Sequence, residues 1–362
     1  MDVVERRIAE GDYMLKGLPG ERKLAEEVGV SYMTARKAVL KLIEKQVLTR
    51  KPNGSLVVHP RMMAGGAVAQ VALLTPAYPS PHLLRCRLEI TRAAERQGVQ
   101  LRPVEYVHWY DPVVKEALQG SDGALIIPST EPLPAPLLKE LRTGEHKVVF
   151  FDSDFSDQGV PSIRLFARSH ITKLLDHLWS LGHRRIDCLN AQGHNDEIGR
   201  RIQHWRQWVD HRQGEGVLWD EPAAPFADPI SSAHEMMRRV LRDEARKLSA
   251  VVCTTQPAAL GAVRACHDAG VEVGSDVSIC TINNEPTGRF FVPSLTGLEM
   301  PRIGPLVERC FAWFAEDDAV WEGDLRVAPE KPDLLRGEST GRARRGWLGH
   351  AEPADTSASG AV

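Results

Sequence analysis

The stretch SYMTARKAVLKLIEKQVLTRKPNGSLVV, residues 31–58, decides the fold expected at the front of this 362-residue chain. Ser31 precedes a run with helical periodicity, and its hydroxyl can accept a hydrogen bond from an early backbone N–H, so we predict a capped helix. The apolar face of this helix is expected to comprise Met33, Val39, Leu40, Leu42 and Ile43. The opposite face is expected to carry Arg36, Lys37 and Lys41.

The flanking residues extend this helix into a larger unit. Residues 3–10 and 21–27 each have a short amphipathic pattern, and the second of these is expected to turn Leu24, Ala25 and Val28 inward. A turn at 29–30 then leads into the basic helix, which makes a helix-turn-helix. Asn53-Gly54 lies between two short apolar runs and predicts a hairpin tip. We therefore predict three helices followed by a wing over residues 1–60.

The charge of this unit points to nucleic acid. The whole chain carries a formal charge of -3, yet residues 31–60 contain six basic residues and one acidic residue. In a helix-turn-helix, the start of the second helix faces the base edges of the major groove. Tyr32, Thr34 and Ala35 occupy that start, with Arg36 and Lys37 next along the helix. A solvated three-helix bundle is the alternative, but the cap, the basic face and the basic wing all favour DNA binding.

Residues 18–58 also resemble the winged helix of GntR-type transcription regulators. The resemblance is carried by Leu18-Pro19-Gly20-Glu21-Arg22-x-Leu24-Ala25 and by Ser31, Thr34, Arg36 and Ala38. Gly20 replaces a capping Ser, and Tyr32 replaces a common Arg, which puts the base preference in doubt. Together, the charge pattern and the resemblance imply DNA contacts from Arg22, Ser31, Tyr32, Thr34, Arg36, Lys37, Arg50, Lys51 and Gly54.

The pattern changes after a linker at 61–69. Short β-rich apolar runs at 71–76, 123–129, 147–154, 185–191, 250–255 and 277–283 alternate with helical stretches at 83–98, 169–182, 232–248 and 257–270. This alternation is typical of doubly wound parallel sheets, and the number of strands is enough for two. Ligands of such sheets bind beyond the carboxyl ends of the strands. We predict an α/β domain over 70–342 and a disordered tail over 343–362.

Several classes of protein are disfavoured by the sequence. The first residues are charged, and no apolar run approaches the length of a membrane span, so we expect a cytoplasmic protein without membrane contact. The six cysteines are scattered and are expected to be buried free thiols. The sequence contains no helical zinc motif, no G-x-S-x-G elbow and no Walker loop, and no G-x-G-x-x-G follows a predicted strand. We therefore predict no enzyme, no catalytic residue, no metal and no cofactor.

Residues 69–342 resemble the effector domain of LacI/GalR-type repressors, which share a two-lobed fold with periplasmic sugar-binding proteins. The resemblance is carried by segments 171–191, 248–286, 293–306 and 332–341. It implies that the chain crosses between the lobes about three times, that the domain dimerises, and that a small effector binds between the lobes. A winged helix on such a dimer implies a pseudo-palindromic operator.

The effector residues of this family carry over only in part. Arg201 matches the family's ligand-gripping arginine, and its guanidinium suits hydroxyls or a carboxylate. Asn283, Gln256 with Thr255, and Phe166 stand where the family has acidic or amide residues. Asp152 and Ser129 follow two strands, while Tyr78 and His82 lie where the first strand opens into the cleft, or else cap a helix. The predicted effector residues are Tyr78, His82, Ser129, Asp152, Arg201, Gln256 and Asn283.

Three interpretations of this cleft remain open: a different small ligand, with a carboxylate as one option, a sugar held differently, and no effector at all. The sequence predicts a sequence-specific DNA-binding regulator, and a repressor rather than an activator. In the alternative, the protein binds DNA constitutively and its α/β domain only dimerises. Trp205, Trp208 and His183 are expected to be structural.

Overall fold

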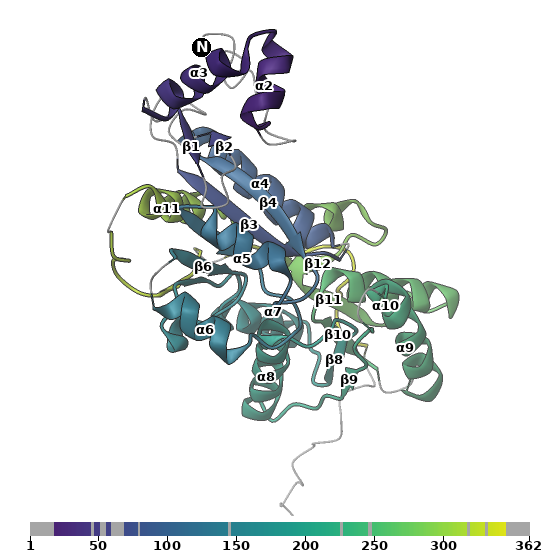
Figure 1. The fold of residues 1–362 in the computed structure, drawn as a ribbon. Helices are drawn as coiled ribbons and strands as arrows, with labels where there is room; N and C mark the ends of the chain where they lie inside the picture. Colours follow the sequence, from purple (N-terminus) through teal and green to yellow (C-terminus); the bar gives the residue numbers. More distant parts are fainter. Residues whose placement is uncertain are drawn as a thin grey trace, which may run out of the picture.

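The computed structural model describes residues 18–44, 47–50, 56–58, 69–78, 80–143, 146–224, 227–244, 248–316, 319–329 and 332–344. The described part comprises a small N-terminal unit followed by two α/β lobes (Figure 1). The predicted first helix at 3–10, the Asn53-Gly54 tip and the tail from 345 lie outside the described residues, as do linker residues 61–68.

The N-terminal unit contains two helices and a two-stranded antiparallel sheet. Its elements are α2 (Glu21–Val28), α3 (Tyr32–Glu44), β1 (Leu48–Arg50) and β2 (Leu56–Val58). Gly29 has a positive φ of 70° and ends α2, which makes the sharp turn into α3 possible. The core of the unit is formed by Leu24, Val39, Leu42, Val47, Leu48 and Leu56. The predicted helix-turn-helix and its two wing strands are confirmed.

The predicted apolar face of α3 is partly wrong. Met33 and Leu40 are 60% and 53% exposed, whereas Ala35, which was expected near the bases, is buried. Ala35, Val39 and Leu42 are the buried residues of α3 and repeat at helical spacing. Met33 and Leu40 lie seven residues apart, on the opposite side of the helix. This side is therefore both apolar and basic, and it faces away from the core.

The first lobe is built on a six-stranded sheet in which every pairing is parallel, in the order β13-β7-β6-β5-β3-β4. Its strands are β3 (Gln70–Pro76), β4 (Gln100–Tyr106), β5 (Gly123–Ile126), β6 (Val148–Phe151), β7 (Ser162–Ile163) and β13 (Arg326–Val327). Its helices are α4 (Pro81–Gln97), α5 (Pro112–Gln119), α6 (Ala135–Arg142) and α11 (Gly304–Ala315), with the short η2 (Ser156–Gln158) after β6.

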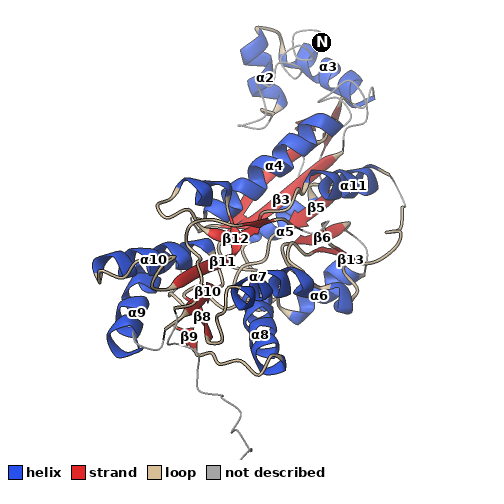
Figure 2. Ribbon diagram, turned by 180° about the vertical axis from the view of Figure 1, so that it is seen from behind, coloured by secondary structure: helices blue, strands red, loops and turns tan. Residues whose placement is uncertain are grey.

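The second lobe has a six-stranded sheet in the order β14-β12-β11-β10-β8-β9, and only the β12–β14 pair is antiparallel. Its strands are β8 (Ile186–Asn190), β9 (Leu218–Asp220), β10 (Ala250–Cys253), β11 (Ser278–Asn284), β12 (Thr296–Glu299) and β14 (Leu334–Leu335). Its helices are α7 (Arg168–Ser180), α8 (Asp196–His211), α9 (Pro229–Glu244), α10 (Gln256–Asp268) and the short η3 (Pro286–Phe290). Figure 2 shows the two sheets from behind.

The chain passes between the lobes three times, after β7, after β12 and after β13. Each lobe is thus made of non-contiguous segments, as the resemblance implied. The six expected strands and four expected helices are all present. The edge strand β4 escaped prediction because Arg102 and Pro103 interrupt its apolar pattern, which an edge position tolerates.

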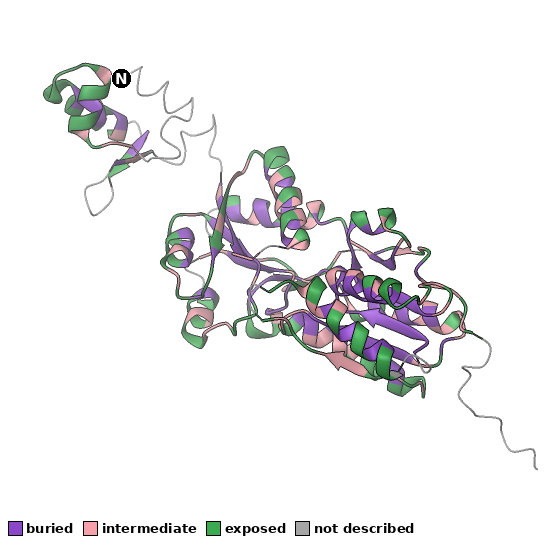
Figure 3. Ribbon diagram, turned by 90° about the vertical axis from the view of Figure 1, so that its right-hand side faces the viewer, coloured by how far each residue is buried: buried purple, intermediate pink, exposed green. Residues whose placement is uncertain are grey.

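The interior is packed as the sequence predicted (Figure 3). All six cysteines are free and buried, and Trp205 and Trp208 belong to the main core. His183 is buried and bonds Ser249 Oγ through Nδ1 at 2.6 Å, with Gly341 O 3.0 Å from Nε2. None of the helices in the described ranges has the length and apolarity needed to cross a bilayer.

Candidate functional site

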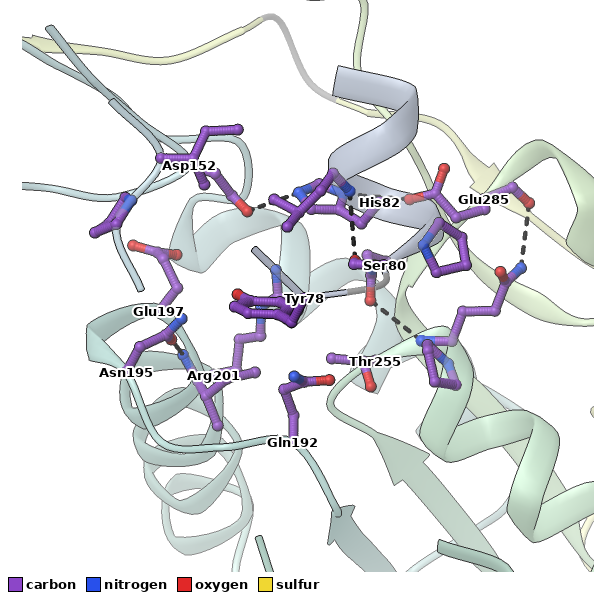
Figure 4. A pocket seen from close by; sticks show the side chains of 18 residues that line it. Tyr78, Ser80, His82, Asp152, Gln192, Asn195, Glu197, Arg201, Thr255 and Glu285 are labelled. Atoms are coloured by element: carbon purple, nitrogen blue, oxygen red, sulfur yellow. Dashed lines mark hydrogen bonds and ion pairs between the residues drawn. The ribbon is translucent and has the colours of Figure 1, made fainter. Parts of the chain in front are cut away.

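A pocket lies between the two lobes, at the carboxyl ends of strands from both sheets (Figure 4). About 730 Å³ of empty space, including the open mouth, lies between its walls. The first lobe contributes the segment after β3 and the residues after β5 and β6. The second lobe contributes α8 and the residues that follow β8, β10 and β11. This is the position at which doubly wound sheets bind ligands.

Three helices begin at this pocket, and two of them are capped by side chains there. Ser80 Oγ accepts a hydrogen bond from the backbone N–H of Leu83 at the start of α4. Asn195 Oδ1 accepts one from Ile198 N at 2.9 Å at the start of α8. The third helix, α10, begins at Gln256. The positive ends of three helix dipoles therefore meet near the pocket, which favours ligands rich in oxygen.

Six of the seven predicted effector residues line the pocket: Tyr78, His82, Asp152, Arg201, Gln256 and Asn283. The seventh, Ser129, is not among the lining residues. It is buried, its backbone N–H donates to the Tyr106 hydroxyl at 2.8 Å, and its Oγ accepts from Glu131 N at 3.2 Å. Ile127 and Pro128 take the lining position after β5 instead. Ser129 therefore stabilises a turn behind the pocket wall.

His82 lies between two carboxylates. Its Nε2 is 2.8 Å from Asp152 Oδ2, and its Nδ1 is 3.2 Å from Glu285 Oε1. Burial of the imidazole lowers its pKa, but the Cys86 sulfur and the Asp152 carboxylate outweigh burial and raise that pKa well above 6.5. Protonation of His82 is thus favoured relative to that of a free imidazole. The protonated ring offsets one of the two carboxylate charges that it touches, and Arg85, whose Nη1 lies 3.6 Å from Glu285 Oε2, offsets the other.

Glu197 is a second buried acidic residue in the pocket wall. Burial raises the pKa of Glu197 to about 7, although Arg164, whose Nε lies 3.3 Å from Oε1, lowers it. The Asp152 carboxylate contributes further to the rise. Glu197 is therefore close to half protonated at neutral pH. In that state the carboxyl group can either donate or accept a hydrogen bond.

Several polar atoms around the pocket have no hydrogen-bond partner among the described residues. In the lining they are Asp152 Oδ1, Glu197 Oε1, Arg201 Nε and Thr255 Oγ1. Burying such atoms without partners costs about 1–3 kcal/mol each. A bound molecule with several hydroxyl groups would satisfy these donors and acceptors together. Their chemistry is therefore that of a site for a polar ligand.

Phe166 does not fill the cleft. It is buried in the main core, and the guanidinium carbon of Arg201 lies 5.3 Å from its ring centroid. Gln256 and Asn283 are joined by a 3.3 Å hydrogen bond from the Gln256 backbone N–H to Asn283 Oδ1. Phe166 thus supports Arg201 from behind, while the two amide residues belong to the polar wall.

Sequence reasoning missed Glu197 and Glu285 as lining residues, together with Gln192 and Asn195. The sequence position of each of the four, next to the end of a strand, could have identified them. Gln192 and Asn195 follow the β8 run, Glu197 lies in the first turn of the next helix, and Glu285 directly follows β11. The positions at which the family carries acidic residues are occupied by Asn283, Gln256 and Phe166 in this chain. Carboxylates instead enter the pocket from neighbouring positions.

The candidate DNA-binding surface lies on the exposed side of the N-terminal unit. Arg22, Tyr32, Thr34, Arg36 and Lys37 are all exposed. Ser31 acts as the predicted cap, since its Oγ accepts from Thr34 N at 3.2 Å and lies 2.8 Å from Thr34 Oγ1. Lys51 and Gly54 lie outside the described residues. The surface keeps the charge and the geometry expected of a recognition helix.

Glu21 joins the three elements of this unit, a role that the sequence did not reveal. Its carboxylate accepts a hydrogen bond from the Tyr32 hydroxyl at 3.2 Å and another from Arg50 Nη2 on β1. The guanidinium carbon of Arg22 lies 6.0 Å from the centroid of the Tyr32 ring. Glu21 thereby fixes the start of α3 relative to the wing.

Comparison with protein families agrees with this division. The family described as "Bacterial regulatory proteins, gntR family" matches residues 1–58. The family described as "Periplasmic binding protein-like domain" matches residues 175–302. The two matches fall on the N-terminal unit and on the second lobe. They confirm both resemblances drawn from the sequence.

Individual proteins show the same relationship. The lactose operon repressor of Escherichia coli (strain K12) is 22% identical over 287 residues, which cover 76% of this chain and 78% of the repressor. A crystal structure of the lac repressor dimer bound to operator and the anti-inducer ONPF has a TM-score of 0.64 at 17% identity and covers 78% of this chain and 97% of that one. The structure of a transcription regulator GntR from Chromobacterium violaceum has a TM-score of 0.61 at 21% identity, over 75% and 99% of the two chains. The chain therefore joins a GntR-type winged helix-turn-helix to a two-lobed periplasmic binding protein-like domain related to that of the LacI/GalR regulators.

Proposed function

We propose that this protein is a sequence-specific DNA-binding transcriptional repressor whose operator affinity is controlled by a small polyhydroxyl effector, a sugar or a sugar acid, bound between the lobes. The observation that carries the proposal is the combination of a basic, exposed recognition helix with a polar pocket of unpartnered atoms in one chain. The named relatives, repressors among them, support the regulatory role.

The effector half of the proposal rests on the pocket wall. A body that served only for dimerisation would have no need for buried polar atoms around a cleft, Asp152 Oδ1, Arg201 Nε and Thr255 Oγ1, that have no hydrogen-bond partner among the described residues. Asp152 and Glu197 offer acceptors, while Arg201 offers a donor, which is the mixture that adjacent hydroxyl groups require. The pocket also has two basic side chains, His82 and Arg201, so it can accommodate an effector that carries an acidic group.

The dimer half rests on an exposed apolar surface. Leu84 and Leu88 lie one turn apart on the outer side of α4 and are both exposed. Phe290 and Val292, at the end of η3, are 79% and 93% exposed. The Arg85–Glu285 ion pair holds the start of α4 beside the start of η3. A second copy of the chain covering these residues would give two recognition helices for a pseudo-palindromic operator.

Two measurements test the proposal. In vitro selection of random duplexes with the full chain should enrich one palindromic sequence, and the affinity should fall steeply with salt. A thermal-shift screen against sugars, sugar acids and nucleosides should give one class of hits, since a ligand at a hundredfold excess over its Kd adds about 2.7 kcal/mol to the free energy of unfolding. Enrichment without any hit would favour the constitutive DNA-binding protein. Absence of enrichment would overturn the proposal.

A further inference from the structure

The first turn of α4 carries the polar contacts between the lobes at one side of the pocket. His82 and Arg85 belong to the first lobe, and both reach Glu285, which follows β11 of the second lobe. The distances are 3.2 Å from His82 Nδ1 to Glu285 Oε1 and 3.6 Å from Arg85 Nη1 to Glu285 Oε2. The Glu285 side chain is only 6% exposed, so solvent screens these contacts weakly.

The other ring nitrogen of His82 binds a residue that faces the ligand. Asp152 follows β6 and has a positive φ of 54°, which is uncommon for a residue other than glycine. This backbone conformation places Oδ2 at 2.8 Å from His82 Nε2, while Oδ1 is buried without a partner. One carboxylate is therefore shared between His82 and the pocket. A ligand that binds Oδ1 acts on the group that orients the His82 ring.

We propose that His82 is a positioning residue that connects the effector to the lobe interface. One of its ring nitrogens contacts Asp152, and the other contacts Glu285 of the second lobe. The inference rests on the proposed effector pocket and names the residue through which occupancy changes lobe contact. A ligand that fixes Asp152 would fix the imidazole in the orientation that holds Glu285. Without a ligand, Asp152 itself is held on this side only through Oδ2, because its Oδ1 has no hydrogen-bond partner among the described residues.

The charges around His82 support this role. The groups facing it are Asp152, Glu285 and Arg85, with the Cys86 sulfur 3.6 Å from Nε2 and the Tyr78 hydroxyl close enough for its pKa to respond to His82. Two carboxylates and one guanidinium leave a net negative surrounding, which a protonated imidazole neutralises. Loss of the imidazole proton would leave two carboxylates from opposite lobes facing a neutral ring. The connection between the lobes would then weaken.

Hydrogen exchange in the free, full-length protein tests the connection without operator or effector. The amides of 284–295 should exchange at least fivefold faster in His82→Gln and in Glu285→Gln, while the β8 amides stay unchanged. The double variant should exchange no faster than Glu285→Gln alone, because that substitution already removes the ion pair between His82 and Glu285. His108→Gln is the matched control: His108 Nδ1 lies 2.6 Å from Glu131 Oε1, but that pair is confined to the first lobe. It should leave 284–295 unchanged.

The pH dependence provides a second readout that a merely structural role would not give. His82 has its pKa raised in the folded protein, so its contribution is complete below pH 6.5 and is lost as pH rises through the folded pKa. The fivefold difference between wild type and His82→Gln should therefore shrink at alkaline pH. Equal exchange in wild type and both single variants, additive effects in the double variant, or the same acceleration in His108→Gln would overturn the inference. Operator selection is unaffected by these outcomes, so failure of the His82 connection is distinguishable from failure of the proposed function.

Discussion

Arg201 on α8 donates a hydrogen bond from Nη1 to the backbone carbonyl oxygen of Thr254, the residue after β10, at 2.8 Å. The same side chain lines the pocket, where its Nε has no partner among the described residues. One guanidinium thus has two tasks. It fixes α8 against the end of a central strand of the second lobe, and it presents a donor to the cleft.

Replacing Arg201 should therefore change both stability and ligand response. Arg201→Lys keeps the charge but cannot reproduce the fork that reaches Thr254 and the pocket together. We expect the free energy of unfolding to fall by about 1–3 kcal/mol, the cost of an unpaired buried carbonyl, in urea denaturation. The thermal shift with any hit from the screen should disappear. Arg206→Lys, exposed on the same helix, is the control and should change neither; a normal shift in Arg201→Lys would remove this residue from the site.

The second prediction concerns base recognition by α3. Arg36 is exposed on the recognition helix, beside the buried stripe formed by Ala35, Val39 and Leu42. Arg36→Ala should cost about 1–3 kcal/mol on the selected operator and relax the preference at one base position. Competition binding against single-base variants of the operator measures both quantities. An equal loss on every sequence would mean that Arg36 touches only phosphate. Lys41→Ala, further along the helix, should instead lower the salt slope by about one unit.

Most of the fold followed from the sequence because period and turn residues are local signals. The alternation of apolar runs with helical stretches predicted both sheets, and the Ser31 cap fixed the start of α3 to the residue. The edge strand β4 was missed because Arg102 and Pro103, which are both exposed, interrupt its apolar pattern. Met33 and Leu40 were misplaced because α3 has apolar residues on two sides, and hydrophobicity alone does not say which side is buried.

The pocket was predicted less completely, for a tertiary reason. Six of the predicted residues line the pocket: the strand-end rule pointed to Asp152, whereas the family resemblance pointed to Arg201, Gln256 and Asn283. Ser129 obeys the same rule in sequence, but its hydroxyl turns back to the Glu131 amide. Whether Glu197 and Glu285 enter the cleft depends on how the two lobes meet. No periodicity in the chain encodes that relationship.

The third prediction uses the raised pKa of Glu197, about 7 against 4.5. The folded protein holds this proton more tightly than the unfolded chain, so stability from Glu197 is present at low pH and falls as pH rises from 4.5 to 7. The shift corresponds to at most about 3 kcal/mol. Burial and nearby arginines lower the pKa of His204 to about 4. The stability contributed by His204 therefore increases as pH rises from 4 to 6.5, opposite to the trend from Glu197.

Glu197→Gln isolates the carboxyl contribution, because the amide resembles the protonated acid at every pH. The difference in unfolding free energy between wild type and this variant should change steadily between pH 4.5 and 7. The wild type should become less stable relative to the variant as pH rises. Urea denaturation at half-unit intervals of pH measures the difference. A constant difference across this range would contradict the raised pKa. His204→Gln should leave that trend in place while removing the opposing one.

The last prediction concerns the packing of α9 against α10 in the second lobe. Gly261 lies within α10, and a Cβ built there would lie 2.3 Å from the backbone oxygen of Ile230 and 2.7 Å from the backbone nitrogen of His234. The two helix backbones can approach this closely only because position 261 has no side chain. Gly261→Ala should therefore lower the free energy of unfolding by about 1–3 kcal/mol, although Ala is the better helix former.

Gly199 provides the matched control. It also lies inside a helix, α8, but a Cβ built there meets nothing within 4 Å. Gly199→Ala should raise the free energy of unfolding by about 1 kcal/mol through helix propensity alone. The two variants make the same chemical change and are expected to move the urea midpoint in opposite directions. If both stabilise the protein, α9 can shift away from α10 at little cost, and the close approach at Gly261 does not constrain the lobe.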